Sequence, residues 1–206
     1  KTNKILLKRR SKFFKNYKIL LFASTHNLEE KLFMHCIKRL INKYNDLKII
    51  IAPRHPERSI KLLELFKKNK LNTSLFNKSR NFNEKIFIVN TMGEMKYYFS
   101  LSDFVFLGGS LVNLGGHNPI EPAKNDCVIA TGSHIYNWEN TFLEMQKNKI
   151  CSICNNVEEF EKFFIKIYNN KTKINMIKKN TKKFAEKQKF KKAILIKTIN
   201  KLIKKI

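Results

Sequence analysis

The chain has 206 residues, of which 43% are hydrophobic, so it can bury a core and is too apolar to be a disordered polymer. No apolar run approaches the roughly 18–20 residues that a membrane-spanning helix needs, and no signal peptide is recognisable. The net charge of +26 calls for either a compositional bias or an anionic partner.

The chain begins at Lys1, inside a charged stretch, rather than at Met. We therefore expect it to be a piece of a longer protein, with residues 1–17 as the remnant of a linker between domains. Residues 18–170 are predicted to form one domain, and residues 171–206 a basic helix that follows it.

Short apolar strands alternate with helical patterns through residues 18–170. Strands are expected at 18–23, 47–52, 73–76, 85–89, 103–107, 127–130 and 150–153, and helices at 28–44, 57–68, 94–101, 119–124, 138–147 and 157–168. The first helix is expected to bury Leu32, Phe33, Cys36, Ile37, Leu40 and Ile41, and the second Ile60, Leu63 and Phe66. This alternation predicts an α/β fold, a Rossmann-like parallel sheet with helices on both faces.

The last segment, residues 171–206, has fourteen lysines and one acidic residue, Glu186. Ile174, Ile177, Phe184, Ile196, Ile199 and Ile203 form a rough apolar stripe along it. The segment is interpreted as a helix packed along the domain with a solvated basic face, or alternatively as an interfacial helix on an anionic membrane.

Only six of the 42 basic residues in the chain are arginine, and asparagine and isoleucine are abundant. Lysine, asparagine and isoleucine share A/T-rich codons, so genome bias accounts for the charge without any function. If the charge is functional, an anionic membrane surface is favoured over nucleic acid, because nucleic-acid readers use arginine for bidentate contacts.

The most informative stretch is Gly108–Pro122, which holds four of the six glycines of the chain and directly follows the strand at 103–107. Glycines after a strand expose backbone N–H groups that an anion can approach. His117, Asn118 and Glu121 add side-chain donors and acceptors to the same turn. We expect a nucleotide site here.

Three further polar turns each follow a predicted strand: residues 24–26, 53–55 and 90–94. The carboxyl ends of parallel strands lie at one edge of a sheet, where such folds bind ligands. The four turns together therefore predict one site.

The cysteines predict no metal site. Cys36 and Cys127 are isolated, and Cys151 and Cys154 form a lone pair without further ligands, whereas structural zinc needs about four. No pair of carboxylates has the spacing of metal ligands. Reduced thiols and no cofactor are expected.

The motifs Pro53–Arg58, Asn90–Met95 and Gly108–Pro122, in this order, closely resemble the carboxyl-terminal half of 3-deoxy-D-manno-octulosonic acid (Kdo) transferase. Residues 23–26 followed by Glu29 and Glu30, and the segment 135–138, match further elements of that family. The resemblance covers roughly residues 20–168. Asn27-Leu28 and Asn113-Leu114 depart from the usual residues of the family.

The resemblance implies the donor-binding domain of a GT-B glycosyltransferase that moves Kdo from CMP-Kdo onto a lipid A precursor in lipopolysaccharide biosynthesis. It places the enzyme at the cytoplasmic face of the bacterial inner membrane. It also implies a separate amino-terminal domain that carries the catalytic base, the acceptor site and the membrane contact. No catalytic residue is then expected in this chain.

By the same resemblance, the residues that contact CMP are Pro53, Arg54, Met92, Gly93, Glu94, Asn118, Pro119, Ile120 and Glu121. Secondary candidates for the donor site are Ser24, His26, Ser110, Gly115, Gly116 and His117. A guanidinium at Arg54 can hold a phosphate by two parallel hydrogen bonds, and the Glu121 carboxylate can accept both ribose hydroxyls. Each position also has a structural interpretation, such as an ion pair between Arg54 and Glu57 or a helix-terminal carboxylate.

Two alternatives remain open from the residues. One is another GT-B enzyme that uses a nucleotide sugar, such as a UDP-sugar transferase or an epimerase. The other is a basic module that binds nucleic acid, which the scattered lysines and the lack of interleaved exposed aromatic residues disfavour.

Overall fold

A computed structural model of the chain describes residues 12–79 and 81–203, and the side chains of residue 189 and residues 191–203 are not described. The strands are β1 (Lys18–Thr25), β2 (Leu47–Pro53), β3 (Thr73–Leu75), β4 (Ile86–Ile88), β5 (Phe104–Leu107), β6 (Val128–Gly132) and β7 (Cys151–Cys154). The helices are α2 (Asn27–Lys43), the 3-10 turn η1 (Pro56–Arg58), α3 (Ser59–Lys68), α4 (Met95–Leu101), α5 (Ile120–Lys124), α6 (Glu139–Lys147), α7 (Val157–Tyr168) and α8 (Lys171–Ile203).

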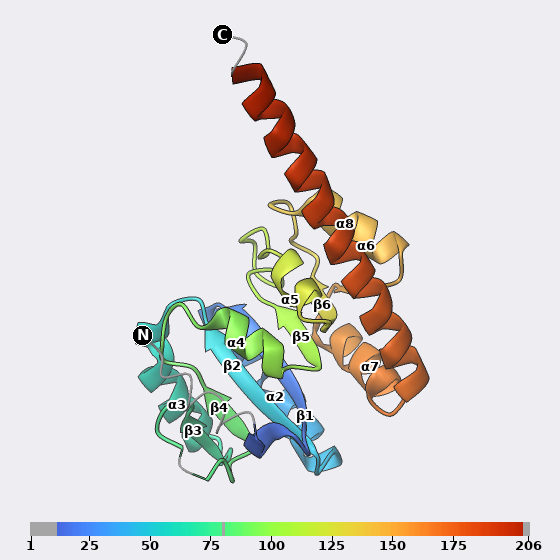
Figure 1. Cartoon of the computed structure of the whole chain (residues 1–206). Coiled ribbons are helices and arrows are strands. Elements are labelled where there is room, and N and C mark those ends of the chain that lie inside the picture. Colours follow the sequence, from blue (N-terminus) through green and yellow to red (C-terminus); the bar gives the residue numbers. More distant parts are fainter. Residues whose placement is uncertain (1–11, 80, 204–206) are drawn as a thin grey trace.

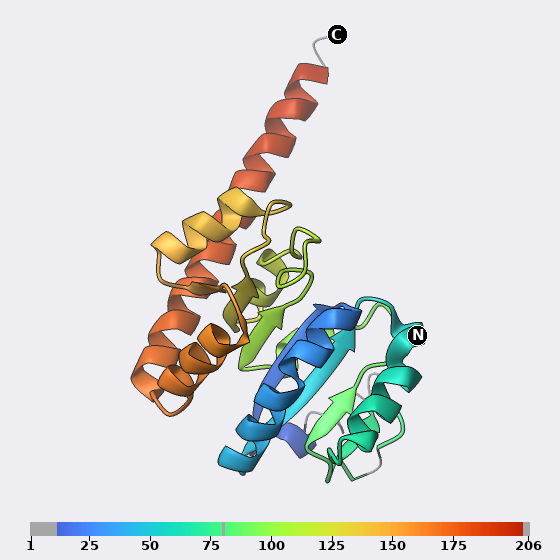
Figure 2. The same ribbon diagram turned by 180° about the vertical axis from the view of Figure 1, so that it is seen from behind.

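The strands within the described residues form one sheet in the order β3-β4-β2-β1-β5-β6-β7, and all neighbours are parallel. Helices cover both faces of the sheet (Figures 1 and 2). The strands are apolar on both faces, as a parallel sheet buried between two helical layers requires. The predicted fold is confirmed.

Alternate residues of the central strands enter two separate cores. Leu20, Phe22 and Phe106 pack with α2, α3, α7 and the first turns of α8. Leu21 and Val105 pack on the other face with α4, α5, α6 and Phe184 of α8. The helix α8 therefore contributes to both layers.

Two helix faces differ from the sequence prediction. Leu32 and Ile60 are exposed, whereas both were expected to be buried. The chain turns through η1 before α3 begins at Ser59, and α3 packs on the core through Leu62 and Phe66, which leaves Ile60 on its solvent side. On α2, Phe33 takes the inward position and packs with a tilted ring against Phe22 and edge-to-face against Phe106.

The basic helix α8 packs against the domain by its first half. Ile174, Ile177 and Phe184 are buried, as the apolar stripe predicts. The end of α8 extends beyond the sheet in both ribbon views (Figures 1 and 2). The side chains of Ile196, Ile199 and Ile203 lie outside the described ones, so that part of the stripe stays a prediction.

The segment expected as a linker contributes to the core at its end. Phe14 is buried, stacks on Phe76 and packs edge-to-face with Phe82 and Phe87. Residues 1–11 lie outside the described residues. Among the described helices, none is long and apolar enough to cross a membrane.

Candidate functional site

The centre of the sheet has a topological switch point between β1 and β5. From β1 the chain proceeds to β2 on one side, and after β4 it crosses over to β5 on the other side. In open α/β sheets the ligand is expected in a crevice at such a switch point, between the loops that leave the two strands, here β1 and β5, at the carboxyl edge. The residues predicted to bind the donor lie on the loops around this crevice.

Close packing between the ends of β1 and β5 explains Gly108. Ser24 has a left-handed backbone, with φ of 55°, where the pairing of β1 with β2 shifts register. Its carbonyl oxygen lies against Gly108, so that a Cβ built there would be only 2.7 Å from that oxygen. Ser24 thus sets the backbone conformation at the end of β1, next to the glycine turn after β5.

The glycine turn already holds a carboxylate, that of Glu29 in the first turn of α2. Glu29 Oε2 accepts the N–H of Gly109 at 2.7 Å, and Oε1 accepts those of Ser110 at 3.0 Å and Leu111 at 3.1 Å. The N–H of His26 also donates to Oε2, at 3.0 Å, which closes half of a capping box. Glu29 is fully buried.

The expectation that these N–H groups are open to an anionic ligand is therefore wrong for Gly109, Ser110 and Leu111. Their anion is a side chain of the protein, which ties the start of α2 to the end of β5. A nest of backbone N–H groups favours a carboxylate as much as a phosphate, so the glycines alone could not distinguish the two.

The imidazoles of His26 and His117 meet beside this turn. Their Nε2 atoms are 3.4 Å apart and the rings are parallel within 1°. A Cβ at Gly109 would lie 3.2 Å from His117 Nε2, so the glycine gives the ring its room. His55, from the loop after β2, lies edge-on to His26 at 6.1 Å between centroids.

Burial is the largest influence on both rings. It lowers the pKa of His26, against the opposing charge of Glu29. Burial and then the charges of His26 and Arg54 lower the pKa of His117 to about 4. Both rings are thus neutral at pH 7 in the absence of a ligand.

The two arginines of the segment Pro53–Arg58 have different roles. Arg58 donates two hydrogen bonds, of 3.3 and 2.9 Å, to the buried carboxylate of Glu30, which also accepts the Thr25 hydroxyl at 2.8 Å. Arg54 is exposed, and its N–H donates to the Thr25 carbonyl at 2.9 Å. Within the part of the chain that the structure describes, no carboxylate pairs with the Arg54 guanidinium.

The loop after β4 is held by Glu94. Its Oε2 accepts hydrogen bonds from the Thr91 hydroxyl at 2.7 Å and from the Tyr98 hydroxyl at 3.1 Å. Gly93 has a positive φ of 78° and open space where a side chain would be. Met92 is 76% exposed, so this loop presents an apolar side chain and bare backbone to solvent.

The predicted contact residues at Asn118–Glu121 form the entry to α5. Asn118 Oδ1 accepts the N–H of Ile120 at 2.8 Å, which fixes the turn, and Pro119 precedes the helix. Glu121 is exposed in the first turn of α5, and its carboxylate has no hydrogen bond or ion pair within the described residues. Glu121 also lines a hollow with Lys96 of α4.

Gly115 and Gly116 serve the packing of the same loop. A Cβ at Gly115 would lie 2.3 Å from Asn137 Nδ2, and one at Gly116 would lie 3.2 Å from the His134 carbonyl. Asn137 Nδ2 donates to the Leu114 carbonyl at 3.0 Å, and the backbone N–H of Asn137 donates to the Gly115 carbonyl at 3.1 Å. The segment 135–138 thus supports the glycine loop.

Ser110 is also occupied within the protein. It is fully buried, donates its hydroxyl to the Leu107 carbonyl at 2.6 Å and accepts the N–H of Gly132 at 2.7 Å. These bonds join the ends of β5 and β6.

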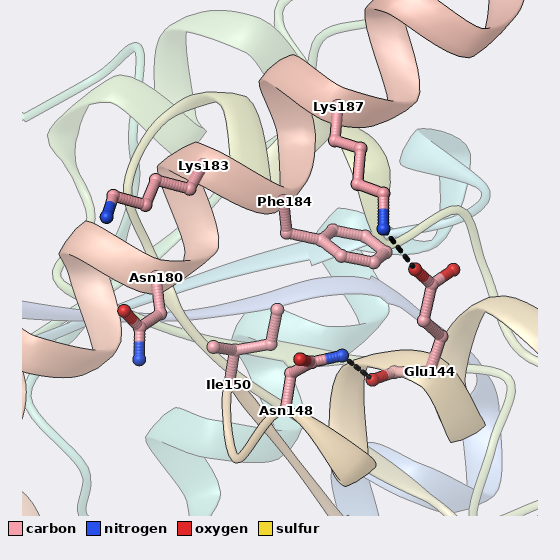
Figure 3. A pocket seen from close by; sticks show the side chains of 7 residues that line it. All are labelled: Glu144, Asn148, Ile150, Asn180, Lys183, Phe184 and Lys187. Atoms are coloured by element: carbon pink, nitrogen blue, oxygen red, sulfur yellow. Dashed lines mark hydrogen bonds and ion pairs between the residues drawn. The ribbon is translucent and has the colours of Figure 1, made fainter.

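A separate hollow of about 300 Å³ lies away from this site, between α6 and α8 (Figure 3). Its lining residues are Glu144, Asn148, Ile150, Asn180, Lys183, Phe184 and Lys187. Ile150 precedes β7, so the hollow lies at the amino edge of the sheet, opposite the loops described above. Among the described residues, no group of His, Cys, Asp or Glu is arranged to hold a metal ion.

Comparison with curated proteins finds several 3-deoxy-D-manno-octulosonic acid transferases and a bifunctional glycosyltransferase/methyltransferase of Fusobacterium nucleatum among the relatives of the chain. The chain is 37% identical over 126 residues to the 3-deoxy-D-manno-octulosonic acid transferase of Haemophilus influenzae, covering 60% of the chain and 30% of the relative. It is 31% identical over 186 residues to that of Rickettsia felis, covering 87% of the chain and 39% of the relative. The chain is a relative of the Kdo transferases. No family model matches it.

The comparison of folds agrees. The C-terminal CMP-Kdo binding domain of WaaA from Acinetobacter baumannii superposes with a TM-score of 0.80 at 22% identity, over 88% of this chain and 98% of that domain. HepE of Anabaena in complex with UDP-glucose gives 0.64 at 10% identity, over all of this chain and 54% of that one. The chain therefore has the fold of a GT-B carboxyl-terminal domain, while it spans 24 to 39% of the curated Kdo transferase and glycosyltransferase sequences compared first.

Four residues of the site were not among the candidates from the sequence: Glu29, Glu30, His55 and Arg58. Glu29 and Glu30 carried a usable signal, since two acidic residues in the first turn of a helix suit its dipole and its cap. That signal predicts the helix start but not the partners across the sheet.

Proposed function

We propose that this chain binds CMP-Kdo at the carboxyl edge of its sheet, as the donor domain of an enzyme that transfers Kdo to a lipid A precursor. The observation that carries the proposal is the Arg54 guanidinium, which pairs with no carboxylate of the described residues and lies close enough for its charge to lower the pKa of His117. The relationship to Kdo transferases supports the choice of donor.

The loops around the crevice suit the three parts of a cytidine nucleotide. Arg54, stiffened by Pro53 and Pro56, meets the phosphate. The exposed Met92 and the unobstructed backbone of Gly93 suit the face of the pyrimidine, with Glu94 holding that loop in place. The free carboxylate of Glu121 accepts ribose hydroxyls, and Asn118, Pro119 and Ile120 position it.

The chemistry then divides between two domains. A sugar hydroxyl of the acceptor attacks the anomeric carbon of Kdo, and CMP leaves. A carboxylate of another domain takes the hydroxyl proton, while Arg54 stabilises the departing phosphate. On this account the chain alone binds CMP and transfers nothing.

The remaining partners follow from the acceptor. A lipid acceptor requires the enzyme to work at a membrane surface, which we propose is the cytoplasmic face of the bacterial inner membrane. The net charge of +26 favours an anionic surface. No role for nucleic acid is proposed.

Calorimetry with CMP and UMP tests the proposal. We expect CMP to bind more tightly than UMP, and Arg54→Ala to weaken CMP binding at least tenfold, because a hydrogen bond to a charged group contributes about 1.5–3 kcal/mol. Arg39→Ala is the control, since Arg39 pairs with Glu161 on α7. Equal CMP affinity in wild type and Arg54→Ala would defeat the phosphate role, and equal affinity for UMP would favour a UDP-sugar enzyme.

A further inference from the structure

Among the described residues, no carboxylate is hydrogen-bonded or ion-paired to either ring of the pair formed by His26 and His117. Two neutral imidazoles 3.4 Å apart through Nε2 share one N–H, which one ring donates and the other accepts. One added proton keeps this bond, whereas two would set two N–H groups against each other. The pair therefore titrates as a unit that takes one proton readily and a second with difficulty.

The carboxylates near the pair are already engaged. The charged and titratable groups that face His26 are Glu29, Glu30, His55 and Arg58, and those that face His117 are His26 and Arg54. Glu29 accepts four backbone N–H groups, and Glu30 accepts Arg58 and Thr25. Among these groups, none is a free carboxylate that could neutralise a protonated pair.

Arg54 adds a positive charge at the same place. Since His117 has only cationic or neutral groups facing it, an anion placed here would be stabilised by Arg54 and would itself stabilise a proton on the histidines. The filled glycine turn next to the pair leaves these side chains as the donors for an anion on this side of the crevice.

We propose that an oxyanion of the donor binds against His26, His117 and Arg54, and that its binding brings one proton from solvent onto the histidine pair. The proton adds to an imidazole nitrogen, and no other bond is made or broken. The inference rests on the proposed function and names the group recognised in that site, a phosphate or carboxylate oxygen. Affinity for the oxyanion then falls by up to tenfold per pH unit above the pH at which the free pair titrates.

The histidine ring signals in a proton NMR titration report this directly, because the chain has five histidines and exposed His35 is an internal control. With CMP bound, we expect the signals of His26 and His117 to titrate at least one pH unit higher than in the free chain, with His35 unchanged. In His117→Gln, we expect CMP to leave the titration of the His26 signal unchanged, while His35→Gln should behave as wild type.

Four probes separate the sources of the effect. Sulfate tests the oxyanion site without any nucleotide, cytidine tests base and ribose without phosphate, and free Kdo tests the carboxylate. We expect CMP to raise the pH at which the His26 and His117 signals titrate, and cytidine to leave it unchanged.

One outcome is that CMP binds, as shifts of other NMR signals would report, while neither CMP nor Kdo raises the pH at which His26 and His117 titrate. That result overturns the inference and leaves the proposed function standing. If CMP does not bind, the proposed function fails. In that case sulfate and Kdo test the inference without CMP. It is overturned if neither of them raises the pH at which the His26 and His117 signals titrate.

Discussion

The carboxylate of Glu29 lies 2.7 Å from the backbone nitrogen of Gly109, eighty residues further along the chain. This contact crosses the switch point of the sheet and joins the N-terminus of α2 to the glycine turn after β5. The same carboxylate accepts three more N–H groups, so one buried side chain sets the shape of both loops.

Replacing Glu29 by glutamine should therefore destabilise the fold. A carboxamide has one oxygen and one NH2 group, and the NH2 group would face either His26 and Gly109 or Ser110 and Leu111, all of them donors. We expect a loss of about 2–4 kcal/mol in the free energy of unfolding, measured in urea. Glu57→Gln, at an exposed residue, should change it by less than about 0.5 kcal/mol. Equal stability of the two variants would show that the carboxylate is dispensable.

Gly93 and Gly115 have the same left-handed backbone conformation but differ in the space available for a side chain, so they can be compared directly. Gly93 and Gly115 have φ of 78° and 81°, but an added Cβ meets nothing within 4 Å at Gly93 and would lie 2.3 Å from Asn137 Nδ2 at Gly115. Gly93→Ala should cost about 1–2 kcal/mol from the left-handed backbone alone. Gly115→Ala should cost about 1–3 kcal/mol more, seen as a lower melting temperature. The packing assigned to the glycine loop is wrong if both variants melt together.

Two arginine–glutamate ion pairs differ in burial, so they should contribute differently to the free energy of unfolding. Arg58→Ala leaves the buried Glu30 carboxylate without its cation, for an expected loss of about 3–5 kcal/mol. Arg39→Ala opens a more exposed pair with Glu161 and should cost much less than Arg58→Ala. Urea unfolding of both variants provides the comparison. A loss at Arg58 no larger than that at Arg39 would remove its structural role.

Stability at mildly acid pH should depend on His117. Its pKa in the folded chain, about 4, is below the ordinary value of 6.5 because of burial and then of His26 and Arg54. Between these values the unfolded chain binds more protons, so the neutral ring stabilises the fold fully above pH 6.5 and this contribution is lost as the pH falls towards 4.

The size of that effect is roughly 3 kcal/mol at most. In urea unfolding at pH 4.5 and at pH 7, wild type should lose more stability on acidification than His117→Gln. His35→Gln should follow wild type. An unchanged pH dependence in His117→Gln would mean that this ring is not held neutral.

The sequence was sufficient for the order and type of the elements. The helix α7, Val157–Tyr168, was predicted with its observed ends, because Asn156 caps it and its apolar face is regular. The positions of the polar turns followed from the rule that parallel strands end at a common edge. The exposure of Leu32 was missed because adjacent apolar residues such as Leu32 and Phe33 do not fix which of them faces the sheet. The exposure of Ile60 was missed because α3 packs on the core through Leu62 and Phe66.

The partners inside the site could not be predicted in the same way. The sequence places Glu29 at a helix start and Gly109 after a strand, but their contact depends on how α2 crosses to β5 in three dimensions. The same holds for the separation of Arg54 from Arg58, four residues apart, of which one is free and the other is tied to Glu30.

The decisive measurement is a crystal structure of this chain with CMP bound. We expect the phosphate at Arg54 beside His26 and His117, the base at Met92 and Gly93, and the ribose hydroxyls at Glu121. CMP bound elsewhere, for example in the hollow between α6 and α8, with these loops vacant, would contradict it.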